Sequence, residues 1–188
     1  MCKLKILTFI FFFASFFHLN AKDPIGQPLA LDTVIQVSNT SASQLYNGAK
    51  VWLAKNMRSS NNVIQLDDVA NAHLIGKANC AFEVKNFTWS NLSGCIWFTL
   101  DFQARDGRFR LKIYDISHES YNKTYGGAWS EGLVYVNGMP ESLRSGHGKQ
   151  YKEMQKRAVP MMVDYMAWII VSLQEEMTQS TSQENDDW

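Results

Sequence analysis

One stretch of the chain has the residue types of a nucleophilic centre. Residues 128–132 read Ala-Trp-Ser-Glu-Gly, a relaxed nucleophile elbow in which alanine replaces the first glycine. That motif works on a strained strand-to-helix turn of an α/β-hydrolase sheet. Here it lies in a glycine-rich loop that comes after a run of predicted antiparallel strands. We therefore interpret the protein as having no catalytic site. A serine hydrolase using Ser130 with His118 or His147 remains the alternative.

A second group of residues has the types that bind metals. Asp115, His118 and Glu119 lie close together in the sequence, and the imidazole of His147 would be a fourth ligand. Side chains of this kind at the end of a strand are usually solvated. We therefore predict neither a metal site nor a cofactor.

Four aromatic residues give the best candidate for a binding site. They are Tyr121, Tyr125, Trp129 and Tyr135. Rigid amphipathic rings suit the recognition of an envelope protein, a peptide or a glycan. The other interpretation is that these rings fold back over the open face of a sheet, and both interpretations stay open.

The elements that would position these residues are organised around a hairpin between Gly94 and Ser117. Asp106-Gly107 separates two alternating apolar runs, which predicts a type I′ turn. In this register, the residues that pair across the two strands are apolar on one face of the hairpin and polar on the other. The pairs are Phe102 with Leu111, Leu100 with Ile113, Asp101 with Lys112, and Gln103 with Arg110.

The rest of the domain, residues 29–177, is predicted from shorter signals. Ser41 and Gln44 form a capping box before a helix with an apolar stripe. The stripe is Leu45, Ala49, Trp52, Leu53 and Met57. Strands are predicted at 33–37, 63–66, 73–84, 94–103 and 108–116, a long variable loop at 118–148, and a final helix at 149–177 kinked at Pro160.

The two ends of the chain predict export and a polar tail. Residues 1–21 carry two lysines, an apolar run and a terminal alanine, as a secretory signal peptide does. That run is shorter than the roughly 20 residues of a membrane span, so no transmembrane segment is expected after cleavage. We expect the protein in the periplasm or associated with the cell envelope. Residues 178–188 are predicted to be disordered.

The net charge bears on the expected partners of the protein, and the positions of its cysteines bear on whether it contains a disulfide. The mature chain would have a net charge of −2, because the leader holds two of the 18 basic residues and none of the 18 acidic ones. Without a basic block, nucleic acid is not an expected partner. Export would permit a disulfide between Cys80 and Cys95, but strand alternation places them on opposite faces, which favours two free thiols.

Several short motifs resemble one family. They are Trp52-Leu53-Ala54-Lys55-Asn56, Val63-Ile64-Gln65, Ile75-Gly76-Lys77-Ala78, Asp106-Gly107-Arg108-Phe109-Arg110 and Ile113-Tyr114-Asp115-Ile116. The chain resembles domain of unknown function 4468 (DUF4468), found in secreted proteins of Bacteroides-type bacteria. The resemblance implies an α+β, TBP-like fold: a curved antiparallel sheet of about five strands, in the order strand, helix, four strands, helix, with both helices on one face. It implies no activity, so we expect an exported envelope protein that is a non-catalytic binding or accessory module.

Overall fold

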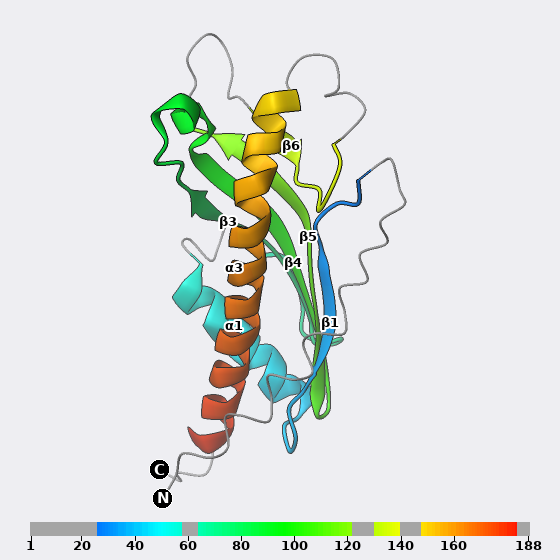
Figure 1. Ribbon diagram of the computed structural model, residues 1–188. Coiled ribbons are helices and arrows are strands. Elements are labelled where there is room, and N and C mark those ends of the chain that lie inside the picture. Colours follow the sequence, from blue (N-terminus) through cyan, green and yellow to red (C-terminus); the bar gives the residue numbers. More distant parts are fainter. Residues whose placement is uncertain (1–25, 58–63, 122–129, 140–147, 184–188) are drawn as a thin grey trace, which may run out of the picture.

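The computed structural model has one antiparallel sheet with two helices on the same face (Figure 1). It describes residues 26–57, 64–121, 130–139 and 148–183, and the side chains of the last range as far as 178. The predicted signal peptide, residues 1–21, lies outside the described residues. The predicted α+β class, with an antiparallel sheet and both helices on one face, is confirmed.

The elements follow one another in the predicted order, with one short strand and one 3₁₀ helix added. They are β1 (Leu31–Gln36), α1 (Ala42–Asn56), β2 (Ile64–Asp68), β3 (His73–Phe82), the 3₁₀ helix η2 (Phe87–Leu92), β4 (Gly94–Arg105), β5 (Arg108–Ser120), β6 (Gly132–Leu133) and α3 (Gly148–Gln183). The strand order is β1-β5-β4-β3-β2, and β6 pairs with the end of β5.

The β4–β5 hairpin has the predicted register. Phe102 lies opposite Leu111 and Leu100 lies opposite Ile113. All four side chains are buried beneath α1 and α3, and Phe102 also stacks on Phe109 with ring centroids 5.0 Å apart. The alternate positions of both strands point to the face that carries no helix. The sheet thus has one covered face and one open face.

The turn at the tip of this hairpin differs from the predicted type. Gly107 has a φ of +74°, but Asp106 does not have a positive φ, so the turn is not type I′. A positive φ at the second central residue alone is what a type II turn requires. Contacts with the start of α1 explain the difference: an Asp106 carboxylate oxygen accepts a hydrogen bond from the Ala42 amide at 2.8 Å, and the Gly107 amide donates to the Thr40 carbonyl at 2.8 Å.

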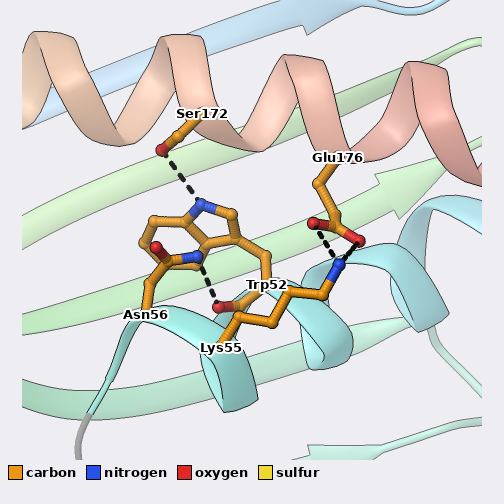
Figure 2. A network of polar contacts seen from close by, with 5 residues as sticks. All are labelled: Trp52, Lys55, Asn56, Ser172 and Glu176. Atoms are coloured by element: carbon orange, nitrogen blue, oxygen red, sulfur yellow. Dashed lines mark hydrogen bonds and ion pairs between the residues drawn. The ribbon is translucent and has the colours of Figure 1, made fainter.

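Helix α1 begins and packs as its sequence predicts. The Ser41 hydroxyl accepts from the Gln44 amide, and the Gln44 side chain accepts from the Ser41 amide at 2.8 Å, which completes the capping box. The predicted apolar stripe is buried. Figure 2 shows how its Trp52 indole donates to the Ser172 hydroxyl of α3 at 2.9 Å, while Lys55 pairs with Glu176 at 2.8 Å. These contacts join the two helices into one layer.

Strand β5 is longer than predicted and contains a bulge. Two residues, Asp115 and Ile116, oppose the single residue Phe98. Asp115 has a φ of +53°, the left-handed conformation that aspartate tolerates better than most residues. The extra residue changes which side chains point inward. Ile116, His118 and Ser120 face the core, whereas unbroken alternation from Ile113 would place Ser117 and Glu119 there.

Other boundaries also differ from the prediction. Within the predicted loop 118–148, β5 continues to Ser120 and β6 forms at Gly132–Leu133. Helix α3 runs through Pro160 as a single helix, as predicted. It ends at Gln183, so residues 178–183 of the predicted disordered tail are helical. In the part of the chain that the structure describes, no helix has the length and apolarity needed to cross a bilayer.

Cys80 and Cys95 are free thiols, as predicted. Cys80 lies on the helix-covered face, with its sulfur 3.7 Å from that of Met162, and pairs in register with Ile96. Cys95, one residue earlier in β4, therefore points to the opposite face. Burial raises the pKa of Cys80 to about 11, so this thiol stays protonated at neutral pH.

Phe109→Ala tests the assignment of the covered face. The ring is fully buried and stacks on Phe102, so its loss should lower the free energy of unfolding by about 3–5 kcal/mol. The exposed Val34 of β1 offers a matched control, because Val34→Ala should change stability by less than about 0.5 kcal/mol. Urea denaturation would measure both, and equal midpoints would show that the faces are wrongly assigned.

Gly107→Val tests the conformation of the hairpin turn. A β-carbon at this position would meet no neighbouring atom within 4 Å, so only the positive φ opposes a side chain. Valine should therefore destabilise the fold by about 1–2 kcal/mol. Gly107→Asn is the control, because asparagine tolerates this region, and its thermal midpoint should stay close to that of the wild type. Equal melting of the valine and asparagine variants would contradict the assigned turn.

Candidate functional site

The candidate catalytic residues lie where a short segment joins the edge of the sheet. Gly132 and Leu133 of β6 pair with His118 and Ser117 of β5. Further along, the Val134 amide donates to the Ile116 carbonyl, and the Leu29 amide donates to the Val134 carbonyl, both at 2.8 Å. Residues 132–136 thus lie between β5 and the start of the domain. Within the predicted loop, this portion is part of the sheet.

The hydroxyl of Ser130 is engaged in backbone contacts. It donates to the carbonyl oxygen of His118 at 2.7 Å and accepts from the Gly132 amide at 3.2 Å. A nucleophilic serine instead needs its hydroxyl hydrogen bonded to a general base. The contacts of Ser130 are those of a residue that closes a turn.

The imidazole of His118 is buried, which corrects the prediction that it is a solvated strand-end residue. The β5 bulge turns it toward the core, where 1% of its surface is exposed and its ring meets Phe82 edge-on at 5.5 Å. Its Nε2 lies 2.8 Å from the Leu92 carbonyl, and its Nδ1 accepts from the Glu131 amide at 3.4 Å. Both nitrogens therefore have backbone partners.

Burial also decides the charge of this histidine. Desolvation lowers the pKa of His118, and the smaller opposing effects of the Leu92 carbonyl and the Glu119 carboxylate raise it. The ring is neutral at neutral pH. It could accept a proton from Ser130 only by giving up its bond to Glu131. The alternative partner, His147, lies outside the described residues.

The bulge also separates the residues considered as metal ligands. Asp115 is exposed and His118 faces the core, whereas Glu119 lies on the open face and accepts from the Trp97 indole at 2.6 Å. Across the described ranges, His, Cys, Asp and Glu side chains form no group of three or more that could hold a metal ion.

Two of the four candidate aromatic residues can be placed. Tyr121, just after β5, has 63% of its surface exposed. Tyr135 is half-buried, and its backbone is held by α3: its amide donates to the Tyr151 hydroxyl at 3.1 Å and its carbonyl accepts from Gln155 at 2.7 Å. Tyr125 and Trp129 lie outside the described residues. A ligand site at these four residues remains a prediction.

The open face of the sheet carries a group of side chains that sequence reasoning missed. At its centre, Trp97 of β4 is half-buried, with its indole bonded to Glu119 and the Lys77 ammonium 5.7 Å from its ring centroid. We call Trp97, Lys77 and Glu119 the tryptophan cluster. The signal was present in the sequence, because Trp97 alternates with Ile96 and Phe98, which are buried on the other face.

A second polar group lies nearer the hairpin tip on the same face. The His73 Nε2 lies 2.9 Å from an Asp101 carboxylate oxygen, and the Gln103 amide nitrogen lies 3.3 Å from the same histidine nitrogen. Farther across the sheet, Arg110 pairs with Asp32 at 2.6 Å. Each side chain is held by a neighbour on an adjacent strand, so the open face has a fixed pattern of charge and aromatic surface.

Comparisons with known proteins agree with this architecture. Residues 32–119 match the family model described as a domain of unknown function (DUF4468) with TBP-like fold. A search of curated proteins found no match.

Two solved structures share the fold. One is a TBP-like protein from Parabacteroides distasonis ATCC 8503, with a TM-score of 0.57 and 12% identity over 78% of this chain and 93% of that one. The other is a DUF4468 family protein from Bacteroides ovatus ATCC 8483, with a TM-score of 0.51 and 11% identity over 82% of this chain and 91% of that one. At these identities the likeness shows the fold alone. Together with the family match over residues 32–119, it confirms the predicted resemblance to DUF4468 and the TBP-like fold.

Proposed function

We propose that the protein is an exported, non-catalytic binding module of the cell envelope, and that it binds through the open face of its sheet. The predicted signal peptide supports export. The observation that carries the binding role is the tryptophan cluster, whose aromatic and charged groups remain partly accessible on a face that no described helix covers.

The geometry of the cluster favours recognition over chemistry. A Trp ring offers a large apolar surface, and its fixed position limits the conformational entropy lost on binding. The ammonium of Lys77 and the carboxylate of Glu119 beside it can donate and accept hydrogen bonds to a polar ligand. An aromatic ring flanked by one donor and one acceptor suits a glycan or an extended peptide, including a segment of another envelope protein. The exposed Tyr121 follows Glu119 by two residues and would extend the same surface.

Trp97→Ala tests this surface with two defined probes, a glycan array and a displayed library of random peptides. Wild-type protein should select ligands from at least one of them, and the Trp97 variant should bind those ligands at least about tenfold more weakly, as expected of a central aromatic contact. The control is Val171→Ala, which removes an exposed apolar side chain from α3 in the helix layer. Absence of selection from both probes, or equal binding by the Trp97 variant, would contradict the proposal.

Export is tested separately from binding. In the native bacterium, the mature protein should be recovered from the envelope fraction with an N-terminus at Lys22. An intact leader on cytoplasmic protein would contradict the assigned location without bearing on the open face.

Ser130→Ala tests the hydrolase alternative. Because the hydroxyl bonds to the backbone of His118 and Gly132, its loss should lower the free energy of unfolding by about 1 kcal/mol. Turnover of p-nitrophenyl acetate should be the same in the variant and the wild type. Ser43→Ala, on the exposed surface of α1, is the control for stability. Hydrolysis by wild-type protein that disappears in the Ser130 variant alone would restore the hydrolase.

A further inference from the structure

We propose that His118 is a proton-sensitive clasp that holds residues 130–132 against β5 while its ring is neutral, and loosens them when the ring is protonated. The inference is independent of the proposed binding function. It rests on the two backbone partners of one buried ring and on the segments that those partners belong to.

The partners of the ring fix its tautomer. The Leu92 carbonyl can only accept a hydrogen bond, so Nε2 carries the proton. The Glu131 amide can only donate, so Nδ1 is unprotonated. The neutral ring thereby connects three segments: η2 through Leu92, β5 through its own backbone, and the segment of β6 through Glu131.

Protonation would disrupt one side of this connection. A second proton on Nδ1 would point at the amide proton of Glu131, which turns a hydrogen bond into a repulsive contact. The ring would also carry charge in a site with 1% exposure, against the edge of Phe82. The contact with Leu92 would survive, because Nε2 remains a donor.

The charged groups near the ring do not offset the effect of burial, which lowers the pKa of His118. Phe82 of β3 and Leu92 of η2 present no charge. On β5 itself, Glu119 favours the charged ring, but its effect is smaller than that of desolvation, and the pKa of His118 is lowered. Glu131 lies on the segment that the clasp holds. Its buried carboxylate contributes, after desolvation, to the raised pKa of Tyr151 of α3.

Release would be confined to one end of the segment. Beyond residue 132, α3 anchors the chain independently of His118. The Tyr151 hydroxyl donates to the Leu133 carbonyl at 2.8 Å and accepts from the Tyr135 amide, and Gln155 donates to the carbonyls of Tyr135 and Gly138. Ser130 and Gly132 also contact the backbone of His118, so opening of the clasp loosens residues 130–132 around the Glu131 amide while the following residues stay attached.

The sign of the pH dependence follows from linkage. The closed state binds a proton more weakly than the open state, in which the pKa of His118 rises toward the value of about 6.5 of an exposed histidine. The clasp is fully stabilised above that pH and weakens as the pH falls toward the lowered pKa of the closed state. Between those two values, the opening equilibrium increases by up to about tenfold for each pH unit.

Amide hydrogen exchange of the whole mature protein tests the clasp. After correction for intrinsic exchange rates, protection of the Glu131 amide should fall by up to about tenfold between pH 7.5 and 5.5. The Tyr135 amide, bonded to Tyr151, should keep its protection and serves as an internal control. Equal protection of Glu131 at both pH values would overturn the proposal.

His118→Gln separates titration from packing. Glutamine keeps one donor and one acceptor but does not titrate, so protection of Glu131 should no longer depend on pH. The control is His73→Gln, which removes a histidine of the open face and should leave the wild-type response unchanged. A pH response that persists in the His118 variant would refute the clasp. If that variant does not fold, NMR titration of the wild type decides: the His118 ring and the Glu131 amide must share one midpoint, and different midpoints would refute the proposal.

Discussion

The burial of one face of the β4–β5 hairpin is the constraint on which the rest of the structure depends. Aromatic and aliphatic side chains from both strands form a continuous apolar surface, and α1 and α3 are held over it by their own buried stripes. Trp52 packs into this layer while its indole bonds to α3, so the two helices cover the sheet as a unit. Because both helices lie on one face, polar and aromatic side chains of the alternate positions remain together on the other.

A second constraint couples the hairpin to the start of α1. The Asp106 carboxylate lies at the helix N-terminus, where the amides of the first turn have no partner within the helix and the helix dipole favours negative charge. Ser41 and Gln44 occupy other amides of the same turn. The hairpin tip therefore serves the sheet and the helix at once. This double role accounts for a turn in which Asp106 adopts a conformation other than that of the common two-residue hairpin.

Local patterns in the sequence predicted the elements that depend on interactions between residues close together in the chain. Alternation gave the register of Phe102 with Leu111, and the capping box located the first turn of α1, because each signal lies within a few residues of its effect. The missed features depend on distant partners. β6 has two residues and forms only because β5 offers an open edge, and the turn type depends on an amide 64 residues away. The tryptophan cluster was readable from alternation, but its meaning required knowing which face the helices leave open.

The bulge at Asp115 changes which residues of β5 face the core. Before it, odd-numbered residues are buried; after it, even-numbered residues are. A single residue thus decides whether the imidazole or the neighbouring carboxylate enters the core, although the composition of the strand is the same in either case. Comparison of such domains by aligned position alone would confuse these two outcomes. In a relative with one residue fewer here, a histidine at the matching position would lie on the open face, so the spacing of a residue from the bulge decides which face its side chain occupies.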